Sequence, residues 1–193
     1  MKSIFDQKVK EEILSRLDNL EVDATRNWGK MTVTQMLAHL TRAMKIANGE
    51  TKLKRAFIGR ILGPFFKKLY YNEKPYPKNM KMGIESFVPD ASQFQEEKNK
   101  LRQIIKAFSE GSTASCTKYP HPFFGYFTPD QWGKAVYKHV DHHLRQFSAR
   151  RKNKNNNHSI TIVPTISQNE NKQQKSDIDQ VRNDEKISSA FLK

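Results

Sequence analysis

The stretch TPDQWGKAVYKHVDHHLRQF, residues 128–147, contains the signals that decide the fold of this chain. It opens with a threonine that can cap a helix, a proline suited to the first helical position and a glutamine that completes a capping box. Apolar residues then recur at steps of three and four, which predicts an amphipathic helix from Thr128 to about Ala149. One face of this helix is therefore expected to lie in a core.

Three more segments show the same helical periodicity. They are residues 6–19, a segment capped by Thr32 or Thr34 that stops at Asn48 and Gly49, and a segment that begins after Pro89 and Asp90. The connections at 70–89 and 111–127 contain prolines and are too long to join helices in a simple up-and-down order. The sequence therefore predicts an all-α protein, a four-helix bundle with long crossover connections.

Composition divides the chain near residue 150. Residues 1–150 are long enough to bury a core as one domain, whereas residues 151–193 are dominated by Asn, Gln, Lys, Ser and Asp. Such a tail cannot bury enough apolar surface to offset the entropy that ordering would cost, so it is predicted to be mostly disordered. The net charge of +14 suits an anionic partner, and charge alone does not choose among nucleic acid, a membrane surface and a small molecule.

Other features narrow the setting. The single cysteine, Cys116, rules out an intramolecular disulfide framework, the first residues lack an apolar signal core, and no apolar stretch approaches the roughly 18 residues that span a bilayer. We therefore expect a cytoplasmic protein. Nucleic acid is not an expected partner, because no recognised binding motif accompanies the basic residues.

Residues 52–70 combine six basic residues with bulky apolar ones and have two readings. They could lie on an anionic membrane, or they could form one or two crossover helices that cover the bundle. The second reading is favoured, since a long crossover must pack against something and Gly63 with Pro64 would interrupt an interfacial helix. A membrane-surface partner is therefore not expected.

Two places in the sequence supply histidines that could bind a metal. His139 and His143 are four residues apart in the last predicted helix, a spacing that brings both imidazoles onto one face. That face is the apolar one, whereas His142 lies further round toward solvent. His39 lies on the margin of the apolar face of the second predicted helix. Together the three would make a nitrogen site for a divalent metal with coordination positions left open.

A plainer alternative exists for each histidine. A histidine on an apolar face is more often a core residue whose nitrogens bond to a carbonyl or to water. Spacing alone favours this alternative, because the chain has six histidines and spacing does not select the third ligand. The chain also lacks a His-Glu-x-x-His pattern, so a zinc-protease reading has no support.

Three runs resemble the DinB/YfiT-like superfamily of metalloenzymes: HPFFGYFTPDQWG at 121–133, HVDHHLRQF at 139–147 and WGKMTVTQMLAHL at 28–40. Together they are similar to an uncharacterised branch that still carries a domain-of-unknown-function label, and the resemblance covers residues 3–149. It implies a four-helix bundle with long crossovers. It also implies a divalent metal between one histidine of the second helix and a His-x-x-x-His pair of the last.

Carried onto this chain, the resemblance implies that His39, His139 and His143 bind the metal, with nickel or zinc first and iron or manganese as alternatives. From its position on the helix, Gln146 or His142 is then expected to orient His139 as a neighbouring partner. Relatives in the superfamily activate low-molecular-weight thiols, and others are thought to be hydrolases. The resemblance therefore implies a metal-dependent transferase or hydrolase of a small molecule. The alternative is a basic membrane-surface or scaffold module without catalysis; homodimers are common among such bundles.

Overall fold

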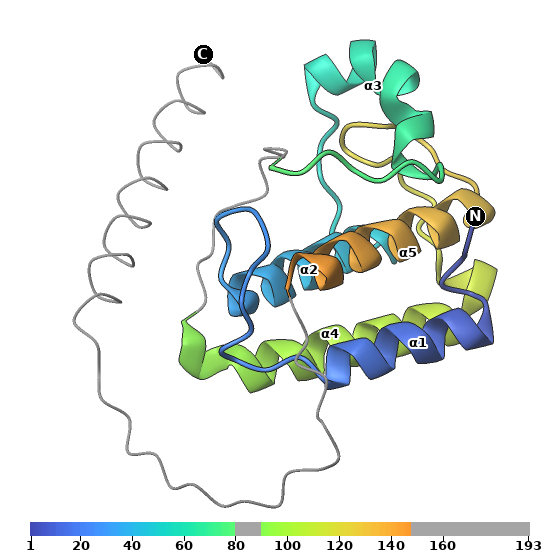
Figure 1. Cartoon of the computed structure of the whole chain (residues 1–193). Coiled ribbons are helices and arrows are strands. Elements are labelled where there is room, and N and C mark those ends of the chain that lie inside the picture. The colour runs from blue at the N-terminus through green and yellow to red at the C-terminus, as the bar shows by residue number, and fades with distance from the viewer. Residues whose placement is uncertain (80–89, 148–193) are drawn as a thin grey trace, which may run out of the picture. The chain divides into compact units, whose positions relative to one another are not determined.

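The computed structural model describes residues 1–79 and 90–147, and every regular element in these two ranges is helical (Figure 1). The helices are α1 (Gln7–Asp18), α2 (Val33–Ala47), α3 (Phe57–Tyr70), α4 (Phe94–Glu110) and α5 (Pro129–Gln146), with short 3-10 helices η1 (Ala91–Gln93) and η2 (Ser112–Ser115). The all-α prediction is confirmed. The expected disorder of 151–193 and the predicted boundary near 150 concern residues outside the described ranges and stay predictions.

Capping boxes fix where the two histidine-bearing helices begin. At α2 the Thr32 hydroxyl accepts from the Gln35 backbone N–H at 3.2 Å, while the Gln35 side chain accepts from the Thr32 N–H at 2.8 Å. Thr128 and Gln131 make the same reciprocal pair at α5, where Pro129 occupies the first helical position. Because each box fixes the first turn, it also fixes the angular position of the residues that follow.

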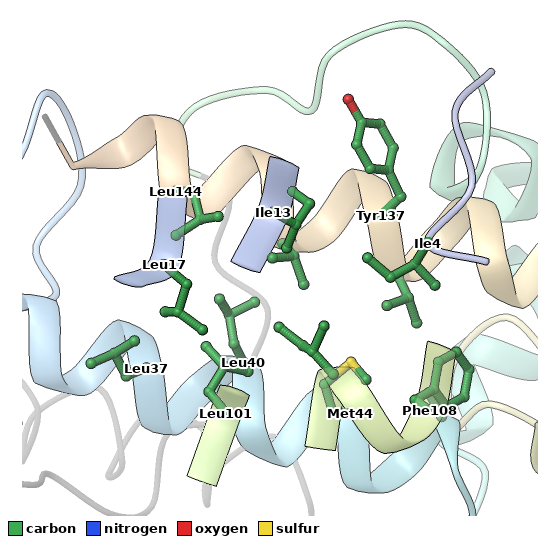
Figure 2. Packing of buried hydrophobic residues seen from close by; sticks show 14 of the residues in the cluster. Ile4, Ile13, Leu17, Leu37, Leu40, Met44, Leu101, Phe108, Tyr137 and Leu144 are labelled. Carbon is green, nitrogen blue, oxygen red and sulfur yellow. The ribbon is translucent and has the colours of Figure 1, made fainter. Parts of the chain in front are cut away.

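The four long helices pack as two layers, α2 beside α5 and α1 beside α4 (Figure 1). Each helix turns its apolar stripe inward, and Leu17 of α1, Leu40 of α2 and Leu101 of α4 lie close together in the centre (Figure 2). These three side chains are fully buried. The packing brings α2 alongside α5, and this contact carries His39 towards the histidines of α5.

Helix α5 ends three residues earlier than its periodicity predicts. Gln146 is its last residue, and Phe147 is extended and pairs with Arg26 in an isolated antiparallel bridge. The Asn27 backbone N–H donates to the Gln146 carbonyl at 2.7 Å, so the segment before α2 provides a partner for the helix end. The apolar Phe147 that seemed to extend the helix instead packs in the core through this bridge.

The crossover between α2 and α4 contains α3, which differs from the expectation in two respects. The helix continues through Gly63 and Pro64 instead of being interrupted there. Pro64 cannot donate to the Arg60 carbonyl, but it is exposed on α3, so that carbonyl can bond to water. In addition, α3 rests on the loop before α5 through Gly59 and Gly63, while most of its large apolar side chains are exposed.

Within residues 1–79 and 90–147, no helix is both long enough and apolar enough to cross a bilayer.

Candidate metal centre

The structure brings together the three histidines that the sequence singles out. One ligand atom from each of His39, His139 and His143 lies within 4.8 Å of the others, although His39 is a hundred residues away from the pair in sequence. The Nε2 atoms of His39 and His139 are 3.1 Å apart. The ring centroids are 5.1 Å apart for His39 and His139, 4.8 Å for His39 and His143, and 4.9 Å for His139 and His143. The three rings thus surround a common point between α2 and α5.

This separation fits a shared metal ion. Two imidazole nitrogens at about 2.0 Å from a tetrahedral zinc would be roughly 3.3 Å apart, close to the 3.1 Å between the Nε2 atoms. Two nitrogen lone pairs facing each other at this distance repel unless a proton or a cation lies between them. Among the described residues, the cluster contains no carboxylate or cysteine, so a divalent ion there would keep its full charge.

Burial keeps the three imidazoles neutral, which is the state that binds a metal. Desolvation lowers the pKa of His39 to about 4, with a further contribution from the nearby Arg42 guanidinium. Desolvation also lowers the pKa of His143 to about 3 and that of His139 well below its usual range, and the neighbouring imidazoles add to both shifts. At neutral pH all three rings therefore offer a lone pair without first losing a proton.

Gln146 fixes the orientation of His143. Its Oε1 lies 2.9 Å from His143 Nδ1, and its Nε2 donates to the Trp28 carbonyl at 2.9 Å. Because the amide oxygen can only accept, Nδ1 carries the proton and Nε2 of His143 keeps its lone pair for a ligand. Gln146 therefore orients His143, whereas the sequence had suggested His139.

Gly29 makes this arrangement possible. It has a positive φ of 79°, and a Cβ built on it would collide with Nε2 of Gln146. A glycine next to Trp28 thus leaves the amide room to reach the Trp28 carbonyl. This role explains why the Trp28-Gly29 pair belongs to the site although neither residue could bind a metal.

His142 lies beside the cluster and outside it. It is half-buried, with its ring 5.6 Å from Trp28, 5.5 Å from Tyr76 and 5.1 Å from His143. The angular prediction that separated His142 from the pair agrees with this position. His142 thus packs against the rings of Trp28 and Tyr76 at the edge of the cluster. The expectation that it orients His139 stays a prediction.

The sequence did not indicate the cover of the site, which comes from the end of the crossover. The rings of Tyr70 and Tyr76 lie 6.3 and 6.4 Å from that of His139, and the Tyr76 hydroxyl donates to the Tyr70 carbonyl at 2.7 Å. Between His139 and Trp132 is an apolar cavity of about 10 Å³, enough for one water molecule. No periodic pattern marks these tyrosines, because they lie where α3 ends and an irregular segment begins.

Lys138 is also part of this cover. The helical wheel of α5 places it toward solvent, but it is only 7% exposed. Its ammonium donates to the Leu69 carbonyl at 2.6 Å and to Asn72 Oδ1 at 2.8 Å, and lies 4.3 Å from the centre of the Tyr76 ring. The crossover covers this second face of α5, so the expectation of a solvated Lys138 is wrong.

His121 is a buried histidine that does not belong to the cluster. Its Nδ1 accepts from the backbone N–H groups of Phe123 and Phe124 at 3.1 and 3.2 Å, which holds the turn closed by Gly125. Burial lowers its pKa to about 4. His121 is thus the satisfied core histidine that the plainer alternative describes, and the contrast with His39, whose buried Nδ1 has no hydrogen-bond partner among the described residues, is clear.

Comparison with known proteins gives a family without a function. A family model described as a protein of unknown function (DUF1569) matches residues 5–150, which includes all three histidines and Gln146. No curated protein and no solved structure matches the chain.

Proposed function

The chain belongs to the DUF1569 family of proteins of unknown function, and we propose that it binds a divalent metal through His39, His139 and His143 and uses it on a small molecule. The observation that carries this proposal is the cluster itself. Three neutral imidazoles, that of His143 buried and those of His39 and His139 half-buried, converge from two helices, and the Nε2 atoms of His39 and His139 are 3.1 Å apart. A hydrogen bond between His39 and His139 would account for their 3.1 Å distance, but it would not account for the third imidazole, His143, at the same point.

The donor set favours a reactive centre over a structural one. Structural zinc sites take four protein ligands, whereas a site with three protein ligands keeps a position for water or substrate. A divalent ion held by neutral imidazoles acts as a Lewis acid and activates a thiol or a water as a nucleophile near neutral pH. The described residues place no carboxylate in the cluster that could occupy the remaining position or reduce the charge.

The resemblance to the DinB/YfiT-like superfamily supports a thiol transferase or a hydrolase. Within this class we favour an anionic low-molecular-weight thiol as a substrate. Arg42 lies close enough to lower the pKa of His39, and Lys138 and Arg145 lower that of His142 against the opposing effect of Asp141, so positive charge borders the site on both helices beside one carboxylate. These charges would attract an anionic substrate and hold its charged group while the ion holds the reacting atom. Nickel or zinc is the ion we propose first, with iron or manganese as alternatives.

Cobalt(II) substitution tests this function directly. Metal-free protein loaded with cobalt should give the intense visible absorption of a low-coordinate centre, and a low-molecular-weight thiol should change that spectrum and add a near-ultraviolet band. His143→Ala treated with cobalt in the same way should show neither band, with or without the thiol. A cobalt spectrum typical of six ligands would contradict the proposal. So would a cobalt-loaded protein whose spectrum does not respond to any thiol and which also does not hydrolyse ester or amide substrates.

A further inference from the structure

Helix α3 presents an apolar surface to solvent that the bundle does not use. Seven of its large apolar side chains are exposed, among them Phe57 at 78% and Phe65 at 79%. The others are Ile58, Ile61, Leu62, Phe66 and Leu69. At about 3.6 residues per turn these seven share one half of the helix circumference. We refer to them as the α3 stripe.

The stripe is exposed because α3 rests on the protein through a different side. Gly59 and Gly63 are its buried residues, and a Cβ on Gly59 would lie 2.7 Å from Phe123 Cα. The two glycines therefore seat the helix backbone on the loop before α5. In Figure 1, α3 lies apart from the two layers of the bundle, beside that loop. A helix seated by glycines cannot turn its stripe into the core.

The charge around the stripe has a single sign. No acidic residue occurs between Glu50 and Glu73, whereas this interval contains six basic residues. Arg60 and Lys68 are exposed on α3, and Lys52 and Lys54 are exposed just before it. Lysine and arginine stems can follow an apolar surface while their charged ends reach phosphates, so a basic border and an apolar stripe form one amphipathic surface.

We propose that α3 docks the protein on an anionic lipid bilayer, with the α3 stripe among the acyl chains and its basic residues at the head groups. With 14 residues, α3 is too short to cross the hydrocarbon and long enough to lie in its interface. A second copy is a poorer occupant, because its own exposed basic residues would face these. Nucleic acid would leave seven apolar side chains without a partner. Of the two grounds for expecting no membrane contact, the interruption at Gly63 and Pro64 is absent from α3, and the crossover packs through its glycines while its apolar side chains stay exposed.

The docking surface lies next to the cover of the metal centre. Tyr70 is the last residue of α3 and its ring lies 6.3 Å from that of His139, so the docked face borders the cover of the histidine cluster. Docking does not depend on the ion, however, since neither the stripe nor the basic border touches the three histidines.

Vesicle co-sedimentation of the full chain tests the proposal. The protein should bind phosphatidylserine–phosphatidylcholine vesicles, bind phosphatidylcholine vesicles much more weakly, and dissociate as salt is raised. Phe57→Ser with Phe65→Ser should abolish binding to both. Each basic residue near an anionic surface contributes about a fivefold change in partition coefficient, so Arg60→Gln with Lys68→Gln should lower it roughly 25-fold.

Matched variants keep this test specific. Lys8→Gln with Lys106→Gln removes the same charge from exposed positions on α1 and α4 and should change binding far less. His143→Ala should bind vesicles like the wild type, so failure of the metal proposal and failure of docking are separate results. An equal loss of vesicle binding in the two double glutamine variants would overturn the proposal. A folded wild type that does not bind anionic vesicles would overturn it as well. A dimer that Phe57→Ser with Phe65→Ser dissociates, without vesicle binding, would assign the stripe to a second copy instead.

Discussion

Gln146 shows how one amide can set the chemistry of a neighbouring imidazole. By accepting from His143 Nδ1 it fixes the tautomer in which Nε2 is the available nitrogen, and its own bond to the Trp28 carbonyl holds it in place. Gln146→Ala should therefore weaken metal affinity about 10–100-fold, the usual cost of losing such a partner. Competition with a chromophoric chelator measures this change. Gln103→Ala, at an exposed position of α4, is the control, and equal affinities in the two variants would contradict the role.

His121 predicts an acid sensitivity that is independent of the metal. Its pKa is about 4 in the folded protein and about 6.5 in the unfolded chain, so the unfolded chain binds one more proton between these values. The stability that neutral His121 contributes is complete above pH 6.5 and falls by about 1.4 kcal/mol per pH unit as the pH drops towards 4. His121→Asn keeps an acceptor for the two backbone N–H groups and removes this titration.

Urea unfolding at a series of pH values, with chelator present, measures the effect of His121. The free energy of unfolding of His121→Asn should fall less steeply with decreasing pH than that of the wild type. The difference between the two slopes should correspond to at most one bound proton. Above pH 7 the two proteins should differ by a constant amount. Parallel curves between pH 6.5 and 4.5 would mean that His121 is protonated as readily in the folded protein as in the unfolded chain.

The packing of α3 against the loop before α5 depends on its two glycines. Alanine favours a helix over glycine by about 1 kcal/mol, but a Cβ on Gly63 would overlap the Phe123 carbonyl oxygen. Gly63→Ala should therefore lift α3 from its seat and speed the hydrogen exchange of the α3 amides. Lys68→Ala changes an exposed position of the same helix and should leave their exchange almost unaltered. Equal exchange in both variants would show that Gly63 does not seat the helix.

The elements that could be predicted from sequence are those whose signals are local. A capping box at Thr128 marks the start of α5, Thr32 is one of the two caps expected for α2, and the spacing of His139 and His143 places both on one face. Features that depend on a distant segment were not predictable. Lys138 is buried because the crossover lies over it, and α5 stops at Gln146 because residues 26 and 27 pair with its end. A helical wheel represents one helix, so it shows neither the crossover that covers Lys138 nor the segment that pairs with the end of α5.

For the whole molecule, the metal centre would link two helices of one layer. His39 belongs to α2, and His139 and His143 belong to α5, so an ion bound to all three must be released or left on one helix when the bundle unfolds. Nickel or zinc at 100 times its dissociation constant should stabilise the folded protein by about 2.7 kcal/mol. Thermal unfolding should therefore shift upward with the ion and downward with chelator. The same additions should leave the midpoint of His143→Ala unchanged; a shift there would locate the ion elsewhere.

Elemental analysis of protein purified without chelator decides whether His39, His139 and His143 bind one divalent ion. The wild type should contain about one divalent ion per chain. His143→Ala should contain none, while His142→Ala, which alters the adjacent imidazole outside the cluster, should keep the ion. A wild type that neither carries nor takes up a divalent metal, or a His143→Ala variant that retains one, would contradict metal binding by His39, His139 and His143.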